Sequence, residues 1–263
     1  MERPTQYTSN ITGSGSLLPE TFEVMSRLAS GQSLEEVKLE VINNNLLGKK
    51  TEHTRQNTWR DINFRYFNNR DKDFIHQLAK IISSQIAVQA KRLILFFEMA
   101  QSDVLIYDMT VDQLFEMYQQ GHSLVTKTDI DDWLESSILE HPEIKNWTPQ
   151  TRKRVISLYL STVRDCGLLE GRTHKSFIKP YVPLSAFLWV LYRLKEKNLS
   201  PKAIVEAEEF KLFYLDQSTV IILMSEASNA GYISFQYVGD IFDIKFHVDT
   251  LTEVVDGFTS QVQ

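Results

Sequence analysis

The sequence predicts a mainly α-helical protein, with a helical bundle core followed by a C-terminal winged-helix-like α+β segment. From Leu17 to about Leu169 the apolar residues recur at helical spacing almost throughout. After Gly167, further helical segments lead to an alternating stretch over 231–248 that is typical of two strands. Packing helix on helix buries such a series of amphipathic segments. We therefore expect three parts: a flexible N-terminal arm over 1–16, a helical core domain over 17–180 and a winged-helix-like domain over 181–263.

Local composition predicts the N-terminal arm and the first two helices. Residues 1–16 are polar and rich in Gly, Ser and Thr. Pro19 can open a first helix, because proline needs no N–H in the first turn, and Gly31 can end it. Ser33 with Glu36 has the spacing of a capping box, in which each side chain bonds the other residue's backbone N–H.

The remaining core helices are indicated by N-cap residues that precede periodic apolar segments. We expect them after Thr51 and Asp71, over 85–100 and 111–120, after Thr128 with Asp131, and from Thr148-Pro149.

The character of the chain changes after the core. KSFIKP at 175–180 predicts a short strand, and helices are expected at 184–197, 201–214, 217–230 and 250–258. The alternating stretch between the last two predicts a hairpin around the Gly239-Asp240 turn. The order of helix, helix and hairpin is that of a winged helix.

The composition excludes several classes of protein. The chain is 43% hydrophobic, but its longest apolar runs, 93–97 and 186–192, are far shorter than the roughly 18 residues of a membrane span. The N-terminus lacks the charged and apolar regions of a secretory signal. Cys166 is the single cysteine, which excludes an internal disulfide framework and a cysteine-based zinc site. We expect a cytoplasmic protein without a cofactor.

The charge is strongly segregated along the chain, although the net charge is only −6. Residues 98–143 hold eleven acids and one base, Lys127, for a net charge of −10, and 181–263 carry −5. In contrast, residues 144–180 carry +6 and 45–80 carry +4. Because a nucleic-acid footprint depends on local clusters of cations, this distribution leaves nucleic-acid binding open.

The helix that begins at Thr148-Pro149 has the most distinctive surface. On a helical wheel, Val155, Tyr159 and Val163 lie on the core side. The opposite side carries bases and serines, with Asp165 at its edge, and continues into Arg172 and Lys175. Bases can neutralise phosphates, and serines can donate hydrogen bonds to them. The candidate phosphate contacts are therefore Lys153, Arg154, Ser157, Ser161, Arg164, Arg172 and Lys175. A solvated helix surface remains the alternative, and Arg152 points toward the core as a structural contact.

A second basic segment, 49–65, is a weaker candidate. Its bases do not share one stripe on the wheel, since Arg60 and Arg65 lie on opposite flanks of the apolar arc. Lys49 and Lys50 precede the helix and could reach phosphates together with Arg60. Arg55 is expected to have a buried or capping role.

The sequence offers little support for catalysis or metal binding. The six histidines are scattered, without metal-ligand spacing. Asp129, Asp131 and Asp132 stand in the first turn of a helix, where acids favour the cap and the dipole. Cys166 follows a helix C-terminal turn and is expected to be a small core residue. We expect no enzyme and no small-molecule substrate.

Three blocks of the sequence together resemble a known family. They are ITGSGSLLPET at 11–21, GQSLEEVKLEVINNNLLGKKTEHTRQNTWRDINFRY at 31–66 and WTPQTRKRVISLYLSTVRDCGLL at 147–169. In their order and spacing they are similar to BrxA, the small helical component of BREX (bacteriophage exclusion) systems. The resemblance covers most of residues 8–180 and is weaker beyond them.

The resemblance implies a helical core similar to NusB, the RNA-binding antitermination factor, and no catalytic activity. It also implies a part in bacterial defence beside a methyltransferase, an ATPase and a phosphatase-like protein, with binding to DNA rather than RNA.

Two functions of different class follow. The first is an accessory subunit that binds duplex DNA weakly and non-specifically through its backbone phosphates. The second is a scaffold that docks other BREX proteins without binding DNA, through the acidic belt at 98–143 or the C-terminal hairpin. An RNA-binding regulator is a third possibility, and it rests on the NusB analogy alone.

Overall fold

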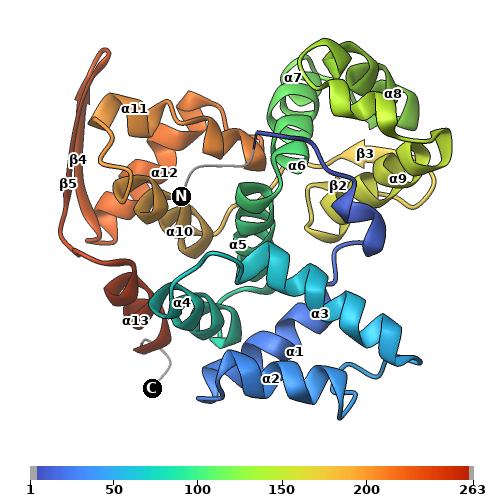
Figure 1. Ribbon diagram of the computed structural model, residues 1–263. Helices are drawn as coiled ribbons and strands as arrows, with labels where there is room; N and C mark the ends of the chain where they lie inside the picture. Colours follow the sequence, from blue (N-terminus) through green and yellow to red (C-terminus); the bar gives the residue numbers. More distant parts are fainter. Residues whose placement is uncertain (1–4, 261–263) are drawn as a thin grey trace.

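The computed structural model describes residues 5–260 and is mainly α-helical, as the sequence predicts (Figure 1). Residues 1–4 and 261–263, which include the start of the predicted arm, lie outside the described part. The elements of the first half are η1 (Asn10–Gly13), α1 (Leu18–Ala29), α2 (Leu34–Ile42), α3 (Glu52–Tyr66), α4 (Lys72–Ser83), α5 (Val88–Ser102), α6 (Val104–Asp108), η2 (Met109–Leu114), α7 (Phe115–Gln119), β1 (Leu124–Val125) and α8 (Lys127–Ser136).

The second half continues with helices and two small sheets. Its elements are η3 (Ser137–Leu139), η4 (Pro142–Asn146), α9 (Pro149–Asp165), β2 (Leu169–Glu170), β3 (Lys175–Phe177), α10 (Leu184–Lys195), α11 (Pro201–Val205), η5 (Glu208–Phe213), α12 (Gln217–Asn229), β4 (Ile233–Val238), β5 (Ile241–Phe246) and α13 (Leu251–Ser260).

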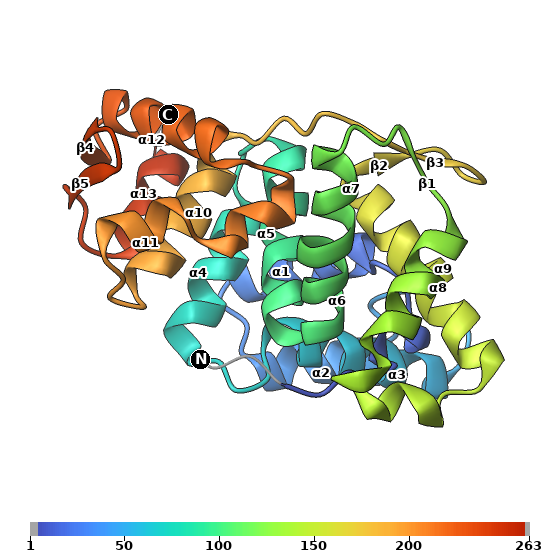
Figure 2. The same ribbon diagram turned by 90° about the horizontal axis from the view of Figure 1, so that it is seen from above.

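Helix α5 lies at the centre of the bundle (Figures 1 and 2). Every residue from Leu93 to Ala100 is buried, and α5 packs against α3, α6 and α10. A helix that is apolar all round can be covered only from several sides, which explains its central position.

One acid interrupts this apolar helix. Glu98 is fully buried and lies 3.0 Å from Nη2 of Arg70 and 3.3 Å from Nε of Arg193. It also accepts a hydrogen bond of 2.8 Å from the indole N–H of Trp189. These contacts join α5 to α10 and to Arg70 in the loop before α4, so the C-terminal segment is fixed to the core through a buried charge.

The predicted helix starts are largely confirmed. Ser33 and Glu36 form the capping box of α2, and Thr51, Asp71 and Thr148 cap α3, α4 and α9. The cap predicted for α8 was wrong, because the box there is formed by Thr126 and Asp129 instead of Thr128 and Asp131. Both pairs have the same spacing, and the shift of two residues follows from strand β1, which ends at Val125.

The N-terminal segment differs from the expected flexible arm. Over the described residues 5–16, Tyr7 and Ile11 are buried, and Ser16 is 9% exposed. The Tyr7 backbone N–H donates to Glu143 at 2.6 Å, and η1 packs against both α3 and α9. The polar composition therefore reflects hydrogen bonds to neighbouring helices.

Two short sheets complete the fold. Strands β1, β3 and β2 pair antiparallel in that order, with Val125 opposite Lys175. Strands β4 and β5 form the predicted hairpin, in which Val238 pairs with Ile241 across the Gly239-Asp240 turn. The hairpin lies at one end of the molecule and helices α8 and α9 at the other (Figures 1 and 2).

The C-terminal segment shares the core of the bundle. Helix α10 packs on α5, α13 packs on α4, and one hydrophobic cluster extends through both segments. The boundary expected at residue 180 therefore does not separate two cores. The helix predicted over 201–214 is broken into α11 and η5, which lets Phe210 stack on Phe187 with ring centroids 5.3 Å apart.

Replacing Glu98 with glutamine should destabilise the fold severely. The change removes the ion-pair partner of the buried Arg70 side chain and leaves Arg193 with Glu196 alone, and removing one partner of a buried pair costs about 3–5 kcal/mol. Urea unfolding at neutral pH measures this loss. Glu196→Gln is the matched control, since Glu196 is half exposed where it pairs with Arg193 and should cost less than about 1 kcal/mol. Equal losses in the two variants would contradict the structural role of Glu98.

Candidate nucleic-acid interface

Helix α9 presents the surface that its sequence pattern predicts. Thr148 caps it, Pro149 occupies its first turn, and the buried side includes Val155, Tyr159 and Val163. Lys153 and Arg154 are exposed on the other side. From Pro149 to Arg164 the helix contains no acid. The wheel thus placed the buried and exposed sides of α9 correctly.

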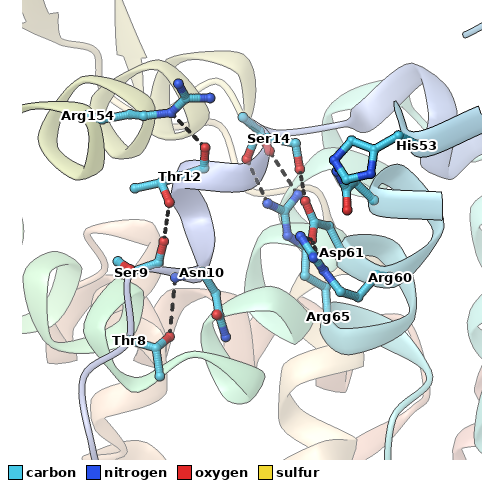
Figure 3. Close-up of polar contacts among 12 residues, drawn as sticks. Thr8, Ser9, Asn10, Thr12, Ser14, His53, Arg60, Asp61, Arg65 and Arg154 are labelled. Carbon is cyan, nitrogen blue, oxygen red and sulfur yellow. Dashed lines mark hydrogen bonds and ion pairs between the residues drawn. The ribbon is translucent and has the colours of Figure 1, made fainter. Parts of the chain in front are cut away.

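A strap, defined here as residues 8–16, lies between α9 and α3 (Figure 3). Its inner side is held by the buried Arg65 of α3, whose guanidinium donates to three consecutive backbone carbonyls. Nη2 donates to Ser14 at 2.9 Å, and Nη1 donates to Gly15 at 2.8 Å and to Ser16 at 3.2 Å. The planar fork of arginine suits this task, because its donors are fixed in one plane.

Asp61 of α3 makes a second contact with the strap. The hydroxyl of Ser14 donates to its carboxylate at 2.6 Å. A Cβ added at Gly13 would lie only 2.6 Å from the same carboxylate, so glycine permits the close approach of the strap to α3.

Helix α9 holds the other side of the strap. Arg154 donates from Nε to the carbonyl of Thr12 at 2.7 Å, and the Ser16 hydroxyl donates to Asp165 at 2.8 Å. Arg154 and Arg60 consequently lie on opposite sides of the strap (Figure 3). The strap therefore brings the two basic segments, which are about ninety residues apart in the sequence, onto one side of the molecule.

Five of the predicted contact residues remain accessible. Lys50, Lys153 and Arg172 are exposed, and their side-chain nitrogens have no hydrogen bond or ion pair with the described residues. The Arg60 side chain is 66% exposed, although it pairs with Asp61 at 3.0 Å. Arg154 keeps its two terminal nitrogens in addition to the Nε that holds the strap.

The other predicted residues are already occupied. Lys49 pairs with Glu20 at 2.5 Å, and Arg164 pairs with Asp165 at 2.5 Å. The Ser157 hydroxyl donates to the carbonyl of Lys153 and the Ser161 hydroxyl to that of Ser157. Because each hydroxyl has a single proton, these serines donate to the helix backbone in this structure, and phosphate contact by them stays a prediction.

Lys175 is buried rather than exposed. It is 6% exposed, and its ammonium donates to the carbonyls of Gly171 at 3.1 Å and Arg172 at 2.6 Å. Burial, and next the nearby charge of Arg164, lower the pKa of Lys175. Residues 171–174 form a tight turn around this ammonium, with Gly171 at a φ of +85°.

A cavity of about 240 Å³ opens beside α9. One wall is formed by Ser157, Leu160 and Ser161, and the others by the turn at 172–175 and by residues 124–127. We call it the basic pocket, because its lining includes four basic side chains and no acid: Lys127, Arg172, His174 and Lys175.

Two of these four residues, Lys127 and His174, were not among the predicted phosphate contacts, although His174 stands in the basic run from Arg172 to Lys175. Lys127 is the one base of the acidic segment 98–143, so its local context suggests a different surface. The pairing of β1 with β3 places Val125 opposite Lys175 and thereby brings Lys127 to the pocket. No local pattern could have indicated this contact, because it depends on pairing between strands fifty residues apart.

Three other predicted assignments are confirmed. Arg152 pairs with Asp131 and Glu135 of α8, and Arg55 donates to the carbonyl of Ile42 at the end of α2. Cys166 is buried, and burial raises the pKa of its thiol well above the usual range. Within residues 5–260, no group of three or more His, Cys, Asp or Glu side chains is arranged to hold a metal ion.

The comparisons with known proteins agree with the blocks that form this surface. The family model of BrxA matches residues 5–191, which include the strap, α3, α9 and the pocket. The chain belongs to the BrxA family. Membership implies a role in BREX-associated phage defence, within a system of several proteins.

The solved structures support the fold of this BrxA-family chain. It is similar to an uncharacterized protein from Magnetospirillum magneticum whose crystal structure is known, with a TM-score of 0.60 and 13% sequence identity. The similarity covers 80% of this chain and 98% of the other. No curated protein gives a significant match. None of the described helices is long and apolar enough to span a membrane.

Replacing Arg65 with leucine should release the strap. The carbonyls of Ser14, Gly15 and Ser16 would lose a charged donor, and each lost bond of this kind costs about 1.5–3 kcal/mol. We expect much faster amide hydrogen exchange over residues 8–16 together with lower stability in urea. Lys38→Leu, at a half-exposed position of α2, is the control. Unchanged exchange of the strap in the Arg65 variant would contradict its anchoring role.

Asp103 should make the stability depend on pH. It caps α6, is 5% exposed and lines a small cavity beside the strap, and burial raises its pKa to about 6. Because this pKa is above the unfolded value of about 4, the folded state binds the proton more tightly, and stability falls as pH rises from about 4 to 6.

Asp103→Asn keeps the cap and removes this dependence. The free energy of unfolding of the variant, relative to that of the wild type, should therefore be about 1–3 kcal/mol higher at pH 7.5 than at pH 4.5. Urea unfolding at both pH values measures the difference. A difference that does not change with pH would show that Asp103 does not titrate in this way.

Proposed function

We propose that this BrxA-family protein is a non-enzymatic accessory subunit that binds duplex DNA through its backbone phosphates. The observation that supports it best is the joint surface of α3, the strap and α9. There Arg60 of α3 and Arg154 of α9 lie on opposite sides of the strap. Lys50 before α3, Lys153 on α9 and Arg172 after α9 have cationic groups without partners among the described residues. The net charge of the protein is negative. Phosphate binding therefore requires local cations that acidic partners do not neutralise.

The acids nearest to α9 are already paired, since Asp131 and Glu135 of α8 both bind Arg152. The bases without acidic partners would therefore attract a phosphate backbone. Contacts of this kind position a protein on the duplex without reading its sequence. Weak, salt-sensitive and largely sequence-independent binding is the expected form.

The salt dependence of DNA binding tests the proposal. Fluorescence anisotropy with a labelled duplex, between about 50 and 200 mM salt, should give a steep linear fall of log K with log salt concentration. In the triple variant Lys50→Gln, Lys153→Gln and Arg172→Gln the slope should decrease by up to about 0.9 for each lost phosphate contact. An RNA hairpin measured beside the duplex tests the RNA-binding alternative.

The matched control removes three charges from other surface positions. Lys202 on α11 and Lys245 on β5 are exposed and Lys38 on α2 is half-exposed, and their replacement by glutamine changes the net charge equally. If both triple variants lower the slope by the same amount, the proposed surface is wrong. If the wild type does not bind the duplex in low salt, the DNA-binding function itself is wrong.

A protein-docking function is the second candidate, because the hairpin tip exposes apolar side chains. Val238 is 81% exposed, Ile241 77% and Tyr237 50%, at the end of the molecule opposite α9. Loss of capture of the other BREX proteins by a Val238→Ser and Ile241→Ser variant, with DNA binding unchanged, would assign docking to the hairpin.

A further inference from the structure

We infer that the basic pocket binds a terminal phosphoryl group, such as the 5′-phosphate at the end of a DNA strand. This inference rests on the proposed DNA binding and adds a preference for phosphorylated ends. It starts from the chemistry of the lining, in which Lys127, Arg172, His174 and Lys175 meet around one cavity. A phosphoryl group is the small ligand whose charge and acceptor oxygens match such a lining.

Two acids near the pocket, Asp129 and Asp165, lie outside its lining. Asp129 accepts hydrogen bonds from the backbone and hydroxyl of Thr126 in the capping box of α8. Asp165 accepts from Arg164 and Ser16. Each of these two carboxylates is therefore held by a partner of its own outside the lining.

The ammonium group of Lys175, at the base of the turn at 171–174, has one donor without an acceptor in the part of the chain that the structure describes. An ammonium has three donors, and two of them are used by the carbonyls of Gly171 and Arg172. The third has no acceptor among the described residues, although the side chain is more than nine-tenths buried and lines the cavity. A buried cation is costly without a counter-charge, and an anion in the pocket would supply one.

The shape of the pocket favours a terminal over an internal phosphate. It is a half-open hollow with walls from α9, the turn at 172–175 and residues 124–127, and a group that projects from its chain can reach most of these walls at once. A phosphate at a strand end projects in this way and carries about −2 charge near neutral pH, whereas an internal diester carries −1. The pocket adjoins α9 about one turn after Lys153, at Ser157, so one duplex could contact both.

Three blunt DNA duplexes of one sequence test the inference on the full chain. One has 5′-phosphates, one has 5′-hydroxyls, and one has both ends closed by loops. We expect the 5′-phosphorylated duplex to bind about tenfold more tightly than the 5′-hydroxyl duplex, which corresponds to one added charge-assisted contact. The closed duplex should bind like the 5′-hydroxyl one.

Two variants locate the effect. Lys127→Gln with His174→Gln changes only exposed side chains of the pocket and should reduce the preference for the phosphorylated duplex to about onefold. Lys50→Gln with Lys153→Gln should weaken all three duplexes together and keep the preference. Equal preference in these two variants would overturn the assignment to the pocket.

The outcomes separate this inference from the proposed function. Equal binding of the phosphorylated and hydroxyl duplexes overturns the pocket assignment and leaves DNA binding intact. If no duplex binds, the proposed function fails, and calorimetry with thymidine 5′-monophosphate and with inorganic phosphate decides the pocket. Binding of either that is lost in the Lys127→Gln, His174→Gln variant supports the pocket as a free-anion site, and no binding of either overturns it.

Discussion

The guanidinium of Arg65 makes the contact on which the candidate surface depends. It lies buried in α3 and satisfies three consecutive carbonyls of the strap, which would otherwise be left partly buried without donors. A polar segment without a hydrophobic pattern can be ordered only through such contacts, since burying its few apolar side chains gains little. Once the strap is ordered, Thr12 and Ser16 become fixed partners for α9. One buried side chain thus places two basic segments side by side.

The electrostatics of the molecule follow from that arrangement. Placing the bases of 45–80 near those of 144–180 raises their mutual repulsion, and several of them are neutralised by local acids such as Glu20, Asp61 and Asp165. Lys50, Lys153 and Arg172 have no such acidic partner among the described residues. Stability alone does not require cations without partners, so we expect these three to contact a phosphate backbone under the proposed function. The basic pocket continues this surface beyond α9.

Sequence reasoning was accurate where the physics is local. Caps such as Ser33–Glu36 and the two sides of α9 depend on residues within a few turns, and both were predicted correctly. The strap, the burial of Lys175 and the position of Lys127 depend on contacts between distant segments, for which a single sequence contains no local signal. The break between α11 and η5 has a similar origin, because the packing of Phe210 on Phe187 overrides a helical pattern.

Hydrogen–deuterium exchange of the full chain, with and without a duplex of about 20 base pairs at low salt, compares the two ends of the molecule in one experiment. The arrangement described here predicts slower exchange over the strap, the first turns of α3 and α9, and the turn at 171–175. The β4–β5 hairpin should not change. Protection confined to the hairpin, with α9 and the strap unaffected, would contradict the assignment of DNA binding to the strapped surface.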